Sequence, residues 1–206
     1  MIYVISGARR TGTSMLMQAI YKGTKTLGLM VADIEAWAYL VDHKRTDGYH
    51  PNPNGAYEVG TMAYQEPAFL RSIPPSSLIK ILFDGLPILP RGEYKIIFME
   101  RDVEEIRASI KRVKEYLKDG DTTSEELTKY LPFSCFRPYN QVEIDHVKGI
   151  CEARSDIDLT VVNYNDVIND PLKEFSRLQA LGWPIIPGVC AGTIDEKLYR
   201  SRNGHL

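Results

Sequence analysis

The segment IYVISGARRTGTS, residues 2–14, decides the fold of this chain. Its opening apolar run is typical of a buried strand, and the residues after Ser14 place apolar side chains on one face of a helix. A strand that turns sharply into a helix through Gly7–Ser14 has the outline of a phosphate-binding loop. Backbone N–H groups and the positive end of the following helix hold an anion in such a loop.

The loop departs from the form found in nucleotide triphosphatases. That form is G-x-x-x-x-G-K-[ST], in which the lysine reaches the β- and γ-phosphates and the hydroxyl ligates magnesium. In this chain Thr13 occupies the position of the lysine, and the cation Arg10 stands three residues earlier. The loop therefore predicts a nucleotide-like anion as ligand and argues against ordinary ATP hydrolysis.

Length and composition predict one α/β domain that spans residues 1–206. Of these residues 44% are hydrophobic and 25% are charged, as in a soluble globular protein. The net charge of −2 gives no support for a nucleic-acid partner or an anionic membrane. Because the first strand begins at residue 2, we expect neither a signal peptide nor a membrane anchor before it, and a cytoplasmic location.

The cysteines and the other possible metal ligands point away from disulfides and metal sites. An odd number of cysteines without paired spacing predicts reduced, buried thiols in a cytosol-like compartment; they are Cys135, Cys151 and Cys190. No group of Asp, Glu, His or Cys residues has the spacing of metal ligands, so we expect no metal ion.

Strand-like and helical segments alternate along the chain. We expect strands over 28–31, 78–82, 94–99 and 158–162, a turn over 87–92, and an exposed loop over 42–57. We expect helices over 14–25, from Asp102 onward with a capping box formed by Asp102 and Glu105, and over 142–153 and 167–181. This order predicts a P-loop-like three-layer sandwich: a central parallel sheet, helices on both faces, and a helical cap.

A second candidate site follows the clearest buried strand, 94–99. Ligands of such sheets bind beyond the carboxyl ends of the strands, where both Arg101 and the loop fall. Ser109 lies eight residues after Arg101 and borders the buried side of the next helix, so the two side chains can grip a second phosphate. The alternative is that Arg101 pairs with a nearby carboxylate and Ser109 bonds to its own helix.

Together the two sites resemble the P-loop sulfotransferase family, which uses 3′-phosphoadenosine-5′-phosphosulfate (PAPS) as donor. The family's loop has the form P-[KR]-[ST]-G-T-[ST], and Arg9-Arg10-Thr11-Gly12-Thr13-Ser14 is similar to it, with Arg9 in the place of the proline. The spacing of Arg101 and Ser109 matches the family's grip on the 3′-phosphate of the donor. The likeness extends along the whole chain and suits small bacterial-type members.

Three further segments resemble parts of this family. Residues 52–58 are similar to an N-P-x-G-x-x-E segment of bacterial members, and residues 163–166 resemble a structural strand–helix element. Residues 198–202 look like the basic C-terminal segment that covers the donor's phosphate, which implies that Arg200 and Arg202 bind the donor. A frayed, exposed tail is the alternative interpretation of this last segment.

The resemblance implies metal-independent, in-line transfer of a sulfuryl group from PAPS, with 3′,5′-adenosine bisphosphate (PAP) as product. Arg10 then faces the bridging and leaving-group oxygens, and the backbone N–H groups of Thr11–Ser14 hold the 5′-phosphate. Lys80 matches a lysine of the family that steadies the sulfuryl group; a solvent-facing lysine on an edge strand is the alternative. Positioning and electrostatic stabilisation supply most of the rate in such reactions.

The residue that activates the acceptor is less clearly marked. Cytosolic sulfotransferases have a histidine two residues after the lysine, where this chain has Leu82. Glu58 is the leading candidate for the base, since its segment resembles the bacterial motif. The other candidates are Asp84, Asp33, His43 and His50.

The sequence is also compatible with two other functions, and it does not identify the acceptor. A P-loop kinase would need a lysine at Thr13 and an acid such as Asp102 at a strand end, and a non-catalytic binding protein would keep the donor pocket alone. The loop 42–57 and the aromatic-rich segment 122–141 are predicted to line the acceptor pocket or to form core under the cap. A small molecule, glycan, lipid or peptide acceptor fits equally, and oligomeric state is not predicted.

Overall fold

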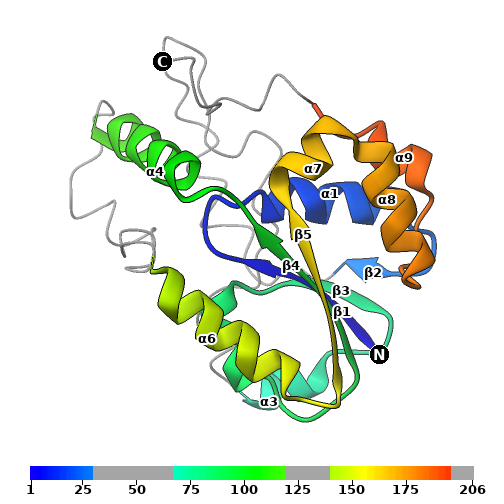
Figure 1. Cartoon of the computed structure of the whole chain (residues 1–206). Coiled ribbons are helices and arrows are strands. Elements are labelled where there is room, and N and C mark those ends of the chain that lie inside the picture. The colour runs from blue at the N-terminus through cyan, green and yellow to red at the C-terminus, as the bar shows by residue number, and fades with distance from the viewer. Residues whose placement is uncertain (30–66, 119–139, 196–206) are drawn as a thin grey trace.

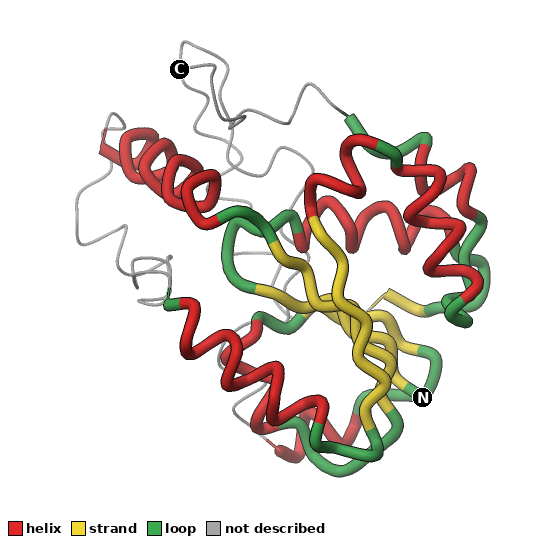
Figure 2. Tube along the Cα trace, viewed as in Figure 1, coloured by secondary structure: helices red, strands yellow, loops and turns green. Residues whose placement is uncertain are grey.

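The structure is a computed structural model that describes residues 1–29, 67–118 and 140–195 (Figure 1). Strands and helices alternate in it, as Figure 2 shows. In chain order the elements are β1 (Ile2–Gly7), α1 (Thr13–Gly23), β2 (Gly28–Leu29), α3 (Pro67–Ser72), β3 (Ser77–Lys80), the 3-10 helix η1 (Phe83–Ile88), β4 (Tyr94–Glu100), α4 (Val103–Lys118), α6 (Gln141–Glu152), β5 (Ile157–Asn163), α7 (Tyr164–Asn169), α8 (Pro171–Ala180) and α9 (Pro187–Ala191).

The described strands form one parallel sheet in the order β2-β3-β1-β4-β5. The first strand lies at the centre, where Ile5 is opposite Lys80 on one side and Ile97 on the other. Because the strands run in the same direction, the loop after β1, the start of α4 and the start of α7 all meet at the carboxyl edge (Figure 1). This edge is where α/β sheets of this kind bind ligands.

Helices cover both faces of the sheet. Side chains alternate along β1, so that Ile5 joins a core shared with α1, α7, α8 and α9, whereas Val4 joins a core shared with α3, η1 and α6. Strands buried on both faces read as continuous apolar runs, which is the pattern of 2–5 and 94–99. The predicted three-layer, P-loop-like α/β fold is therefore confirmed.

Several element boundaries differ from those predicted. The single helix expected over 167–181 is wrong: the chain breaks between α7 and α8, where Pro171 occupies the first turn of α8 and the side chain of Asp170 accepts a hydrogen bond from the N–H of Lys173 at 3.1 Å. The first two residues of the expected turn over 87–92 belong to η1, and α3 and α9 are short helices that no pattern predicted. The other described strands and helices lie within one or two residues of their expected bounds.

The two described cysteines, Cys151 and Cys190, are free and buried, as predicted. Cys135, the loop 42–57 and most of the segment 122–141 lie outside the described residues.

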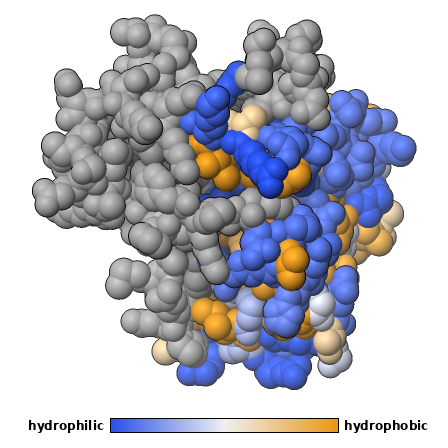
Figure 3. Space-filling model, turned by 60° about the vertical axis from the view of Figure 1, so that its left-hand side comes forward, coloured by the Kyte–Doolittle hydropathy of each residue, from blue (hydrophilic) through white to orange (hydrophobic). Residues whose placement is uncertain are grey.

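In the part of the chain that the structure describes, no helix has both the length and the apolar character needed to cross a membrane. On the face shown in Figure 3 the described surface is mainly hydrophilic, with small separate apolar areas.

Candidate anion site at the carboxyl edge of the sheet

The loop between β1 and α1 has an unusual backbone conformation. Gly7 has a φ of 144°, Gly12 a φ of 94° and Arg10 a φ of 67°. Positive φ is accessible to glycine at little cost, but for a residue with a Cβ such as Arg10 it is uncommon. Strained backbone of this kind persists where the surroundings hold it in place, which occurs most often at functional sites.

Close packing explains both glycines. A Cβ on Gly7 would lie 2.6 Å from the carbonyl oxygen of Met99 on β4, and a Cβ on Gly12 would lie 2.3 Å from Cδ2 of Tyr164. The turn itself is closed by Thr11, whose Oγ1 donates a hydrogen bond to the carbonyl oxygen of Ala8 at 2.8 Å. The loop is therefore pressed against the ends of β4 and β5.

The amino end of α1 points into this loop. Its N-cap residue is Gly12, which has no side chain to accept from the first N–H groups of the helix. The helix is 11 residues long. Amides in this position, together with the positive end of the helix dipole, are suited to bind a phosphate or sulfate group.

The two sites predicted from the sequence meet in space. Nε of Arg10, in the loop, donates a hydrogen bond to Oγ of Ser109, on α4, at 2.9 Å. Ser109 is 6% exposed, so its hydroxyl lies at the boundary of the core. The alternative was that Ser109 bonds only to its own helix, and this hydrogen bond to the loop contradicts it.

Arg101 has partners on both sides. Its Nε donates to Oε2 of Glu105 at 2.8 Å, with 7% and 4% of the two side chains exposed, and its Nη1 donates to the carbonyl oxygen of Arg10 at 3.1 Å. The predicted capping box is thus correct in its first half, because Asp102 accepts from the N–H of Glu105 at 3.1 Å, whereas the carboxylate of Glu105 pairs with Arg101. The alternative interpretation is therefore correct in that Arg101 has a carboxylate partner, and Arg101 also contacts the loop.

The guanidinium of Arg101 also lies over the ring of Tyr164. Cζ of Arg101 lies 4.1 Å from the centroid of the ring, which is a cation–π distance. Burial raises the pKa of the Tyr164 phenol above its usual value, and the positive charge of Arg101 opposes part of that change. The phenol therefore stays neutral at neutral pH.

Lys80 reaches the same region from the other neighbour of β1. Its Nζ donates to Oγ of Ser14, in the first turn of α1, at 3.0 Å. Lys80 is 2% exposed and β3 is an interior strand, so the alternative of an edge-strand lysine facing solvent is wrong. A cation this deeply buried requires polar partners, and it lies next to the loop.

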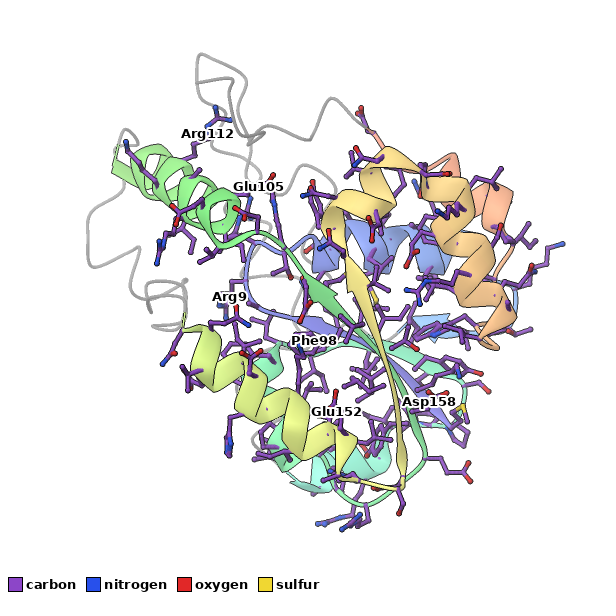
Figure 4. The ribbon with its side chains drawn as sticks, viewed as in Figure 1. Arg9, Phe98, Glu105, Arg112, Glu152 and Asp158 are labelled. Atoms are coloured by element: carbon purple, nitrogen blue, oxygen red, sulfur yellow. The ribbon has the colours of Figure 1, made fainter. Side chains whose placement is uncertain are left out.

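A cavity of about 410 Å³ adjoins the loop on the side of the sheet that α6 covers. Its apolar lining includes Phe98, which lies between the sheet and α6 in Figure 4. Glu105 is not part of this lining; the figure shows it at the start of α4. Thr11 and Arg101 line it from the loop and from the start of α4. The cavity is therefore continuous with the candidate site.

The remaining candidates are placed in part. Arg9 is half-buried in the loop. Asp84 lies in the first turn of η1, the 3-10 helix that follows β3. Outside the described residues lie Glu58, Asp33, His43, His50, Arg200 and Arg202. Among the described residues, no group of three or more His, Cys, Asp or Glu side chains is arranged to hold a metal ion.

Sequence reasoning missed two residues of this site, Glu105 and Tyr164. Glu105 was assigned to the helix cap, and Tyr164 to a structural element. A signal was available for Tyr164, because it directly follows a strand that neighbours β4, and the carboxyl ends of neighbouring parallel strands meet at one edge.

The fold is an α/β fold with a parallel sheet, and the loop that joins β1 to α1 has the outline of a phosphate-binding loop. No protein-family model and no curated protein matches the sequence. Among solved structures, the chain is similar to the sulfotransferase domain from the curacin biosynthetic pathway, with 12% identity, a TM-score of 0.46, and coverage of 100% of this chain and 92% of that chain.

Two further solved structures are similar to the chain. One is retinol dehydratase in complex with androsterone and the inactive cofactor PAP, with 13% identity, a TM-score of 0.45, and coverage of 93% of this chain. The chain spans 62% of the length of that protein. The other is a sugar kinase from a Janibacter species, with 15% identity, a TM-score of 0.39, and coverage of 91% of this chain and 96% of that chain.

Proposed function

We propose that the protein is a sulfotransferase that moves a sulfuryl group from PAPS to a hydroxyl or amine of an acceptor. The observation that carries this proposal is the hydrogen bond from Arg10 to Ser109 at 2.9 Å. It brings the loop against Ser109, and Arg101 donates to the carbonyl oxygen of Arg10 in the same loop at 3.1 Å. The two cations that we assign to separate phosphates of one ligand therefore belong to one cluster of contacts. A donor with phosphates on both its 5′ and 3′ positions needs such a double grip.

Each residue of the site has a distinct task in this proposal. The N–H groups at the start of α1 hold the 5′-phosphate, and Arg10 neutralises the charge that develops on the leaving-group oxygen. Arg101 and Ser109 hold the 3′-phosphate. Lys80, beside Ser14, stabilises the equatorial oxygens of the sulfuryl group during in-line transfer. Arg9, Arg200 and Arg202 add positive charge around the donor.

The reaction breaks the bond between sulfur and the bridging oxygen of the donor and forms a bond between sulfur and the acceptor oxygen or nitrogen. PAP leaves, and the acceptor's proton passes to a base. Glu58 stays the leading prediction for that base, with Asp84, Asp33, His43 and His50 as alternatives. The acceptor class, the cytoplasmic location and the independence from metal also stay predictions.

A kinase function is less well supported by the site. The kinase would need a lysine at Thr13 and an acid that binds magnesium, for which Asp102 was the candidate. Oδ1 of Asp102 accepts from the N–H groups of Glu104 and Glu105 at 2.9 and 3.1 Å, so this carboxylate serves as a helix cap. That role orients it toward α4.

Calorimetric titration tests the proposal. We expect PAP to bind with a Kd in the micromolar range or below in the presence of EDTA, and ATP with magnesium to bind at least tenfold more weakly. Arg10→Ala should weaken PAP at least tenfold, whereas Arg71→Ala, on the exposed surface of α3, should leave it unchanged. Preference for ATP with magnesium would reject the proposal in favour of a kinase. Tight PAP binding without transfer of radiolabelled sulfate to any acceptor would indicate a binding protein.

A further inference from the structure

Tyr164 is held firmly at the carboxyl edge of the sheet. It is the first residue of α7, and the N-cap residue Asn163 fixes the start of that helix by accepting from the N–H of Asn165 at 2.8 Å. Only 6% of Tyr164 is exposed, and its ring belongs to the core shared with α1 and α8. The position of the ring is therefore set by strand, cap and core together.

This one ring contacts both halves of the candidate site. Its face lies 4.1 Å from Cζ of Arg101, and its edge lies so close to the loop backbone that a Cβ on Gly12 would be 2.3 Å from Cδ2. Arg101 in turn donates to the carbonyl oxygen of Arg10 at 3.1 Å. Ring, guanidinium and loop thus form a closed set of contacts around a backbone with positive φ at Arg10 and Gly12.

We propose that Tyr164 is a positioning residue that couples the loop to Arg101 through its ring. A displacement of Arg101 toward a phosphate changes the surface on which the ring lies, and the ring cannot follow without changing its contact with Gly12. Close-packed contacts such as those of the ring with Arg101 and Gly12 transmit a displacement from one partner to the other. The ligand side of this inference rests on the proposed function, whereas the coupling within the protein does not.

The stacking and the packing are properties of the aromatic ring, so the conservative variant should restore them. Tyr164→Phe keeps the ring over Arg101 and against Gly12, and Tyr164→Leu removes it. Tyr94→Leu is the matched control, since Tyr94 is also buried, lies 5.9 Å from the guanidinium carbon of an arginine, Arg154, and stands at the opposite end of β4.

Hydrogen exchange without ligand gives the first readout. We expect Tyr164→Leu to speed exchange of the N–H groups of residues 11–14 at least tenfold relative to those of β3, and Tyr164→Phe and Tyr94→Leu to change this ratio less than twofold. Dividing by the exchange rate of β3, which contains none of the substituted residues, distinguishes a local effect on the loop from a general loss of stability. Unchanged loop exchange in Tyr164→Leu, or equal acceleration in Tyr164→Phe, would overturn the coupling.

Binding gives the second readout. We expect Tyr164→Leu to weaken PAP at least tenfold and adenosine 5′-phosphate at least threefold, since both grips lose their support, and Tyr164→Phe to keep PAP within twofold of wild type. Retained PAP affinity in Tyr164→Leu would contradict the inference. If the wild-type protein binds neither nucleotide, the proposed function fails, and the exchange of the loop still decides the coupling.

Discussion

Nη1 of Arg101 donates a hydrogen bond to the carbonyl oxygen of Arg10, 91 residues earlier in the chain, at 3.1 Å. The loop that carries the strained Arg10 is therefore braced by a side chain of the neighbouring strand end. Arg101 thus has a structural task, supporting the loop, and in our proposal a second task at the 3′-phosphate. These two tasks predict different responses of different ligands to its removal.

Arg101→Ala should weaken PAP by about 10- to 100-fold, because a hydrogen bond to a charged group contributes about 1.5–3 kcal/mol. Adenosine 5′-phosphate has no 3′-phosphate, so it should lose only the few-fold that follows from a less well supported loop. Calorimetry with both ligands measures the difference. Arg107→Ala is the control, as Arg107 lies on α4, which begins two residues after Arg101, but is exposed. Equal losses for the two ligands would show that Arg101 only supports the loop.

Glu105→Gln should lower the stability of the protein and strengthen its response to PAP. The buried pair of Glu105 and Arg101 loses its negative charge, which we expect to cost about 2 kcal/mol, less than full removal of a buried partner because the amide oxygen still accepts. The phosphate then becomes the main counter-charge of Arg101. Thermal unfolding with and without PAP should show a larger PAP-induced rise in Tm than in wild type.

The exposed Glu104 provides the matched control for this experiment, since it precedes Glu105 on the same helix. Glu104→Gln should change neither the Tm nor its response to PAP by more than about a degree, as expected for an exposed ion pair. A smaller PAP-induced rise in Glu105→Gln than in wild type would mean that Glu105 orients Arg101 for the ligand and does not compete with it.

Much of this site was predictable because of the parallel sheet. The apolar runs at 2–5 and 94–99 identify two buried strands, and neighbouring parallel strands bring the loop and Arg101 to the same edge whatever the details of the connections. The position of Ser109, eight residues after Arg101, places it at the border of the buried side of the next helix. The proximity of the loop to the start of α4 follows from these local patterns and the topology, whereas the direct hydrogen bond from Arg10 to Ser109 was not predicted.

Glu105 and the break before Pro171 were not predicted correctly, for two different reasons. The spacing of Asp102 and Glu105 is that of a capping box, but the carboxylate of Glu105 has a stronger partner in the guanidinium of Arg101, four residues earlier, and the burial of this pair is set by the folded chain. Apolar residues keep helical spacing on both sides of Pro171, which hides the break. Periodicity reports which side faces the core, and not whether the backbone is continuous.

Lys80→Met should slow transfer about 100-fold while changing PAP affinity less than threefold, because the cation acts on charge that develops during the reaction. Release of PAP from PAPS, with or without an acceptor, measures the rate. Lys95→Met is the matched control: Lys95 is also a buried lysine on a sheet strand, but it pairs with Asp158 away from the loop. An equal loss of PAP affinity and rate would assign Lys80 to binding the donor, and an unchanged rate would remove it from the site.

Asp156 connects the amino ends of β4 and β5, at the far edge of the sheet from the loop. Its carboxylate accepts from Nη2 of Arg154 at 2.7 Å, from Nη1 of Arg91 at 3.0 Å and from the N–H of Gly92 at 2.9 Å. The hydrogen bonds from Arg154 and from the N–H of Gly92 hold the pKa of this carboxyl far below its usual value. The folded state thus favours the ionised form.

Asp156→Asn should therefore lower stability at neutral pH by an amount that decreases in acid. A carboxyl whose pKa is lower in the folded than in the unfolded state stabilises the protein fully above the unfolded pKa of about 4, and this contribution is lost as the pH falls below that value. Urea unfolding of both proteins should show a constant difference in midpoint from pH 8 to 5 and a shrinking one from pH 4 to 2.5. Glu152→Gln, which removes an exposed carboxylate of α6, controls for net charge. The same difference at pH 2.5 as at pH 7 would mean that the asparagine disturbs packing and that the ionised carboxylate is not what joins the two strands.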